Sequence, residues 1–247
     1  MKPVKLGLEA KRSHRNGGFG IDILHPGLRL DGNDSGIGAI GRIDHANIGA
    51  GTVVRMHPHR DDEILSYMRS GTMIHRDTVG NEEALTNRRM MMMNAGHTFQ
   101  HEERMASEVA MLQIFLRPRA PDLEPTVQFH DFEEVTSDND WRMIAGPMGT
   151  APLEVRANVW VQDTHLGRNE QRDIPPVPVK GATRLLYVFS GMVSVAGTSL
   201  REGESIVLDD GAYGVATREG SDLVLLSTDT SAPVYKQGMF SGNMIGR

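Results

Sequence analysis

The sequence predicts an all-β protein made of two β domains in tandem. Short runs of β-branched and other apolar residues recur along the chain, bounded by Gly, Asp or Asn, at the spacing typical of a β-sandwich or barrel. The periodicity of an amphipathic helix is scarce. The length of 247 residues suits one or two domains, given a prior of ~150 residues per domain.

The expected strands form two groups separated by a proline-rich segment. The first group comprises the runs 38–43, 52–56, 64–68, 90–93 and 110–115. Residues 116–125 contain three prolines and are expected to begin a linker, because proline cannot donate to a strand ladder. After the acidic stretch 132–140, strand patterns resume at 158–162, 184–189, 192–195, 205–208, 213–217 and 223–227. We therefore place one domain at 1–125 and a second at 126–247.

A weak internal repeat is consistent with this division. Residues 67–71 and 187–191 share the pattern Tyr-x-x-Ser-Gly. We expect a hairpin in each half, with the glycine at a turn position that needs a positive φ. The repeat suggests duplication of one domain, and chance similarity between two short segments is the alternative.

Composition excludes several classes of function. The chain contains no cysteine, so disulfides, Fe–S clusters, thiolate zinc sites and cysteine catalysis are excluded. The net charge of −6 is the reverse of the basic balance typical of a surface that binds nucleic acid directly. We find neither a secretory signal nor an apolar stretch of ~18 residues, so the sequence predicts a cytoplasmic protein with no membrane contact.

Two pairs of polar residues predict a metal site in the first domain. His57 and His59 are two residues apart, so on a strand both imidazoles point to the same face. His101 and Glu103 have the same spacing on a second expected strand. Three neutral nitrogens and one carboxylate suit Fe(II), Ni, Co, Mn, Zn or Cu, and leave positions open for catalysis. Histidines satisfied by backbone or water near a surface are the alternative reading of a single such pair.

The residues around these pairs resemble the motifs of the pirin family, within the cupin superfamily. The first motif runs from His57-Pro58-His59-Arg60 through Glu63, Tyr67 and Gly71 to His75-x-Asp77-Thr78-x-Gly80-Asn81. The second is Met93-x-Ala95-Gly96-x-x-x-x-His101-x-Glu103. Shorter landmarks are Ile144-Ala145-Gly146 and Gly238-Met239-Phe240-x-x-Asn243, so the resemblance covers most of the chain.

The resemblance implies a bicupin, with two antiparallel β-barrels of which the first alone binds a metal, usually iron. It implies His57, His59, His101 and Glu103 as ligands. It also implies either a quercetin 2,3-dioxygenase acting on a flavonol or related enediol with O2, or an iron-dependent, redox-responsive regulator that binds a partner protein. A monomer is expected. In the enzyme, Glu103 would also serve as the base for the substrate hydroxyl.

Some residues near the motifs leave alternatives open. Glu63 occupies the place where many cupins have their carboxylate ligand and so competes with Glu103. Thr98 and Glu102 replace the usual family Gly and Ser, which leaves the substrate uncertain. His97 could reach the metal as an acid or base, but a loop histidine without function is the preferred reading. A hydrolase or isomerase that uses the metal as a Lewis acid is a third function.

The remaining polar and thioether residues have simpler expected roles. His75 and Asp77 are expected at a polar strand end, and a role in orienting an imidazole is the alternative. The methionines of 90–93 are expected to fill the barrel interior rather than to bind Cu(I).

Overall fold

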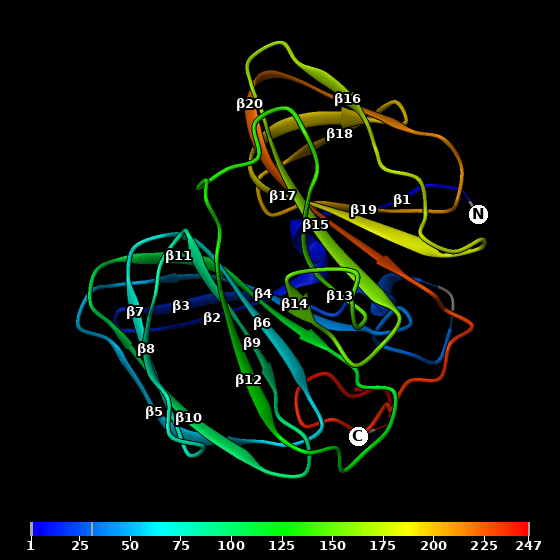
Figure 1. The fold of residues 1–247 in the computed structure, drawn as a ribbon. Coiled ribbons are helices and arrows are strands. Elements are labelled where there is room, and N and C mark those ends of the chain that lie inside the picture. The colour runs from blue at the N-terminus through cyan, green and yellow to red at the C-terminus, as the bar shows by residue number, and fades with distance from the viewer. Residues whose placement is uncertain (1, 31, 247) are drawn as a thin grey trace.

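The computed structural model describes residues 2–30 and 32–246, and within them the protein is all-β, as predicted. The strands form a lower and an upper assembly in Figure 1. The helices in this part of the chain are two short 3-10 segments, η1 (Leu8–Ala10) and η2 (Pro26–Arg29). Neither is long and apolar enough to cross a membrane.

The lower assembly is a barrel made from two facing sheets. Its strands are β2 (Lys11–Asn16), β3 (Phe19–Leu24), β4 (Ile40–Ile48), β5 (Val53–His59), β6 (Glu63–Ser70), β7 (Met73–Asp77), β8 (Glu82–Leu85), β9 (Arg89–Asn94), β10 (Phe99–Met105), β11 (Val109–Leu116) and β12 (Thr126–Asp131). The larger sheet has the order β12-β9-β6-β11-β4-β3-β2, and the smaller has the order β5-β10-β7-β8.

The upper assembly is one strongly bent sheet. Its strands are β1 (Val4–Leu6), β13 (Arg142–Gly146), β14 (Leu153–Glu154), β15 (Val159–Leu166), β16 (Gln171–Asp173), β17 (Thr183–Val195), β18 (Thr198–Arg201), β19 (Ser205–Leu208) and β20 (Gly214–Thr228). The order is β1-β19-β17-β20-β15-β13-β14, with β16 added to β20 and β18 added to β17.

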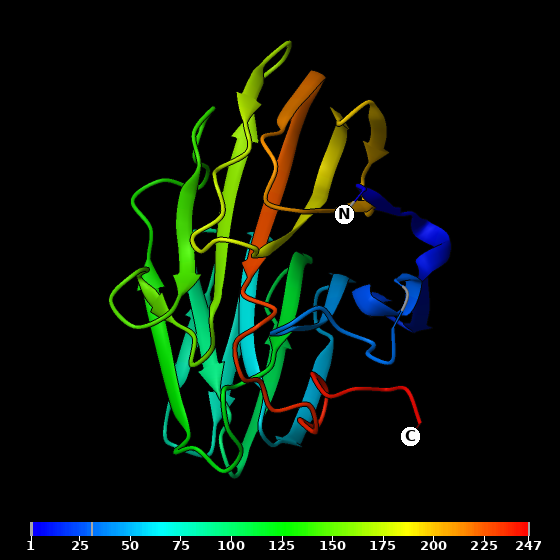
Figure 2. The same ribbon diagram turned by 90° about the vertical axis from the view of Figure 1, so that its right-hand side faces the viewer.

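Three segments pack on the assembly that is built mainly from the other half of the chain. β1 pairs with β19 of the upper sheet, and β12 pairs with β9 of the lower barrel. The C-terminal segment, red in Figures 1 and 2, returns to lie against the lower barrel. The boundary at residue 125 stays a prediction.

The repeated Tyr-x-x-Ser-Gly pattern makes a bend rather than the predicted hairpin. Gly71 and Gly191 both have a φ of 81°, so the expectation of a positive φ is correct. However, β6 and β7, which flank Gly71, belong to different sheets. Gly191 lies inside β17, where the pairing with β20 shifts register. The hairpin prediction was wrong because the glycine allows one strand to bend between faces of a barrel. For the same reason, the predicted runs 184–189 and 192–195 form one strand, β17. The predicted runs 213–217 and 223–227 likewise form one strand, β20.

Three apolar clusters hold the fold together. One cluster fills the lower barrel, and a second fills the upper assembly. The third lies in the layer between the two assemblies. The four methionines of β9 alternate: Met91 and Met93 face the barrel interior, whereas Met90 and Met92 face the layer between the assemblies. All four are fully buried. The prediction that they fill the barrel interior is therefore correct for Met91 and Met93, whereas Met90 and Met92 belong to the core between the assemblies.

Candidate metal centre

Strands β5 and β10 bring three histidines together inside the lower barrel. The two strands are antiparallel, and His101 is directly opposite His57. Nε2 of His59 lies 3.1 Å from Nε2 of His57 and 3.0 Å from Nε2 of His101. All three ligand atoms lie within 4.8 Å of one another. The predicted convergence of these imidazoles is confirmed.

The protonation of His57 and His101 suits a metal ion. Nδ1 of His57 donates to the carbonyl of Arg55 at 2.8 Å, which leaves its Nε2 with a free lone pair. Burial lowers the pKa of His57 and of His101, so both rings are neutral near pH 7. Nitrogens that coordinate one ion at ~2.1 Å and at right angles are ~3.0 Å apart, which matches the observed spacing. The donor set therefore fits a first-row metal ion.

Glu103 lies beside this cluster but is not a member of it. Its Oε1 accepts a hydrogen bond from Nε2 of Gln113 at 3.0 Å and lies 3.7 Å from Nδ1 of His101. Burial raises the pKa of Glu103 to about 7. A β-bulge between His101 and Glu103 shifts the register of β10 against β5. Glu103 lines the same cavity as His57 and His59, and its role as fourth ligand stays a prediction.

Glu63 is engaged elsewhere. Its Oε1 accepts from Nε of Arg156 at 2.8 Å, and its Oε2 accepts from the backbone N–H of Arg156 at 3.0 Å and from the Asn94 side chain. Arg156 belongs to the second half of the chain, so this buried ion pair joins the two assemblies. The structure therefore gives Glu63 a partner other than the metal cluster.

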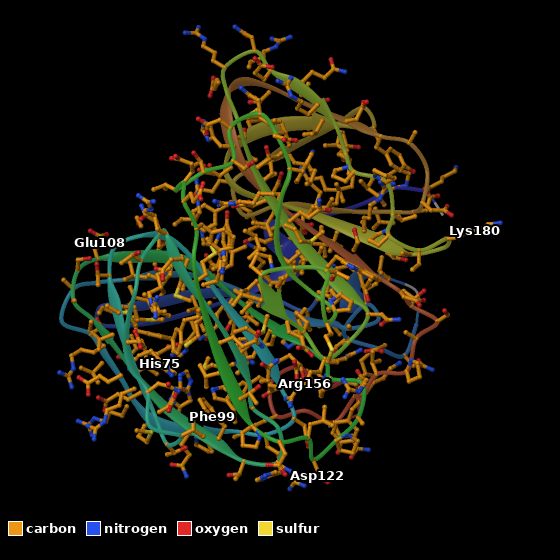
Figure 3. All side chains as sticks on the ribbon, viewed as in Figure 1. His75, Phe99, Glu108, Asp122, Arg156 and Lys180 are labelled. Atoms are coloured by element: carbon orange, nitrogen blue, oxygen red, sulfur yellow. The ribbon has the colours of Figure 1, made fainter. Side chains whose placement is uncertain are left out.

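His75 lies directly behind the cluster, where the sequence favoured a simple strand end. Its Nδ1 is 3.4 Å from Nδ1 of His101, and its Nε2 is 2.9 Å from Oδ2 of Asp77. Phe99 stacks almost parallel to the His75 ring, at 8°. Figure 3 shows both His75 and Phe99 inside the lower barrel. The His-x-Asp spacing indicated only that His75 and Asp77 share a face of their strand. The pairing of β7 with β10 is what brings His75 against His101.

His97 lies outside the site. It is in the turn after β9, about two-fifths exposed, and its Nε2 is 3.5 Å from Glu124. It is not part of the histidine cluster.

The cavity beside the histidines has a volume of about 200 Å³. Sequence reasoning assigned no role in the site to several residues that line it: Arg42, Asp44, Gln113, Phe115 and Phe240. The two-residue spacing of Arg42 and Asp44 on one strand was a signal that both point to the same face, and the tertiary structure turns that face into the cavity. No pattern in the neighbouring sequence indicated that Phe240 would line the cavity. Phe240 lies outside the strands, and contacts with residues distant in the chain hold its segment in place.

The family model of Pirin matches residues 28–116. The quercetin 2,3-dioxygenase of Escherichia coli K12 is 32% identical over 225 residues, which cover 87% of this chain and 94% of that relative.

Two solved structures have the same fold. Bacterial pirin YhhW from Escherichia coli, in complex with nickel(II), matches with a TM-score of 0.78 at 22% identity, over 94% of this chain and 100% of that chain. Quercetin 2,3-dioxygenase from Acinetobacter baumannii matches with a TM-score of 0.77 at 23% identity, over 95% of this chain and 80% of that chain. The bicupin prediction is confirmed. By sequence, motif and fold, this chain belongs to the pirin family of the cupin superfamily.

Proposed function

We propose that this protein is a metal-dependent dioxygenase that acts on a flavonol or a related enediol. The observation that supports this most directly is the convergence of three Nε2 atoms beside a cavity. Relatives from Escherichia coli and Acinetobacter baumannii are named quercetin 2,3-dioxygenase, which supports the same reaction class.

His57, His59 and His101 would hold one divalent ion, with Glu103 as the proposed fourth ligand. Fe(II) is our first choice. Nickel is the second metal to test, because the related YhhW was solved with nickel(II). Co, Mn, Zn and Cu are compatible with the same donors. When bound, the ion supplies Lewis acidity and open positions for substrate oxygens and dioxygen.

Glu103 would also accept the proton of the substrate hydroxyl. Its Oε1 is occupied by Gln113, whereas Oε2 has no protein partner among residues 2–30 and 32–246. The rest of the cavity wall is largely apolar, with Phe19, Ile21 and Met111 among its residues. Such a wall excludes bulk water from an ionised enediol, which limits competing reactions.

The test combines elemental analysis with oxygen uptake. We expect about one metal ion per chain after expression in iron-replete medium, and oxygen consumption when a flavonol or a smaller enediol is added. His101→Ala should lose both, because it removes a central imidazole. His97→Gln is the matched control, since its ring is outside the cluster, and it should keep both. Loaded protein that consumes no oxygen with flavonols or enediols would contradict the proposal and favour the regulatory alternative.

A further inference from the structure

Arg42 places a positive charge in the same cavity as the histidines. Arg42 and Asp44 are two residues apart on β4 and both face this cavity. Nε of Arg42 donates to Oδ1 of Asp44 at 2.7 Å, and Nη2 donates to Oδ2 at 2.5 Å. In the described part of the chain, Nη1 has no hydrogen-bond partner. The guanidinium is therefore held firmly by Asp44, with one donor group still available to a ligand.

Phe115 and Phe240 pack against each other and against this guanidinium. Its Cζ lies 5.1 Å from the centroid of Phe115 and 5.4 Å from that of Phe240, and the two rings are 5.5 Å apart. Phe240 also packs against His59, with centroids 4.9 Å apart. Phe240 therefore contacts both Arg42 and a histidine of the cluster.

The C-terminal segment fixes the position of Phe240. The backbone N–H groups of Phe240 and Ser241 donate to the buried carboxylate of Asp62, at 3.1 and 2.8 Å. Gly238 approaches so closely that an added Cβ would lie 2.4 Å from the carbonyl oxygen of Asp61. This wall of the cavity is consequently built into the fold.

Size and charge together restrict the ligand. The cavity of about 200 Å³ is smaller than the roughly 300–1,000 Å³ typical of sites for drug-sized molecules. Its lining carries one cationic side chain, Arg42, and two acidic ones, Asp44 and Glu103. A bound divalent ion would therefore leave one net positive charge, which suits a monoanionic ligand.

We propose that the substrate is a small anionic enediol or hydroxy-enone, with one ring or an open chain, whose carboxylate binds Nη1 of Arg42. This inference rests on the proposed function, because it assumes that a metal ion at the histidines binds the enediol oxygens. The cavity volume of about 200 Å³ favours a single-ring ligand over a three-ring flavonol. Arg42 would set the preference for a carboxylate, and Phe240 would set the size limit.

Three probes with the same chelating group test the proposal. Comenate and kojate are single-ring hydroxypyranones of similar size, and only comenate carries a carboxylate; 3-hydroxyflavone adds further rings. Their dissociation constants are measured by calorimetry with the nickel-loaded protein. We expect comenate to bind at least about tenfold more tightly than kojate, as a charge-assisted hydrogen bond of ~1.5–3 kcal/mol implies. We expect 3-hydroxyflavone to bind most weakly.

Three variants separate charge from size. Arg42→Gln/Asp44→Asn removes both charges but keeps a hydrogen-bonded pair, and it should abolish the preference for comenate; Arg42→Lys should retain it. Phe240→Ala should improve binding of 3-hydroxyflavone without changing the ratio of comenate to kojate. Nickel content is measured for every variant, so that loss of metal is not mistaken for loss of ligand.

The outcomes that overturn the inference differ from those that overturn the dioxygenase. Binding of 3-hydroxyflavone by the wild-type protein as tight as that of kojate, which also lacks a carboxylate, would overturn the size limit. An unchanged preference for comenate in the double variant would overturn the role of Arg42. Failure of the dioxygenase would instead appear as absence of oxygen uptake by the iron-loaded protein with all three probes.

Discussion

His75 supports the proposed metal ligand His101 from the side away from the cluster. Their Nδ1 atoms are 3.4 Å apart, and Nε2 of His75 lies 2.9 Å from Asp77. Asp77 is fixed in turn by hydrogen bonds from the Asn81 side chain and backbone. Because an ionised carboxylate only accepts, we assign the His75 proton to Nε2, which leaves its Nδ1 to accept from Nδ1–H of His101. This arrangement orients the unprotonated Nε2 of His101 toward the other histidines.

Replacing His75 should therefore weaken metal binding. His75→Leu removes the acceptor for His101, and loss of such a supporting contact typically costs 10–100-fold in metal affinity. The dissociation constant for nickel can be measured by competition with a chromogenic chelator. His97→Gln, on the exposed turn, should keep the wild-type value. Similar constants for His75→Leu and wild type would show that His101 is oriented without this contact.

The ion pair between Glu63 and Arg156 should contribute strongly to stability. Glu63 is fully buried, and Arg156, labelled in Figure 3, is 12% exposed. Arg156→Met would leave a buried carboxylate without its partner, at an expected cost of about 3–5 kcal/mol in the free energy of unfolding. The double variant Glu63→Gln/Arg156→Met should recover much of this loss. Urea unfolding of both variants tests the prediction, which fails if the single variant is as stable as the double.

Gly71 is required at its bend for two separable reasons. Its φ is 81°, and an added Cβ would lie 2.0 Å from the carbonyl oxygen of Glu108. Gly51 has a nearly equal φ of 78° with no atom within 4 Å of such a Cβ. Gly51→Ala should therefore cost about 1–2 kcal/mol from backbone strain alone. Gly71→Ala should cost clearly more in thermal unfolding, and equal losses would contradict the steric explanation.

Stability should decrease below neutral pH because of His45. Burial, together with the charge of Lys11, lowers the pKa of His45 from 6.5 to about 4. Its Nδ1 lies 3.0 Å from the Tyr187 hydroxyl, which itself accepts from Lys11, so the neutral ring is the acceptor. The unfolded chain binds more protons between pH 6.5 and 4, so stability falls as the pH falls through this window, by about 2 kcal/mol at pH 5.

This effect can be isolated with two histidine variants. Urea unfolding of the metal-free protein at pH 7 and pH 5 should show a smaller decrease for His45→Gln than for wild type. His14 is exposed, so His14→Gln should keep the full decrease. A wild-type decrease in His45→Gln would assign the acid sensitivity to other groups.

The sequence by itself determined the fold class and the three histidines. Both depend on local alternation: His57 and His59 share a face because a strand repeats every two residues, and the apolar runs show that same period. The spacing of His75 and Asp77 was visible too, but its meaning was not, because it depends on β7 lying beside β10.

Only the tertiary structure decided which acidic residue faces which partner. Glu63 and Glu103 are both carboxylates on strands of one barrel, yet Glu63 pairs with Arg156, which is 93 residues away in the chain. Phe240 reaches the cavity through tertiary contacts of its segment, among them the hydrogen bond from its backbone N–H to Asp62 and that from Arg117 to the carbonyl of Ser241. Periodicity records where a side chain points relative to its own strand, whereas the identity of its neighbours depends on how strands and terminal segments pack.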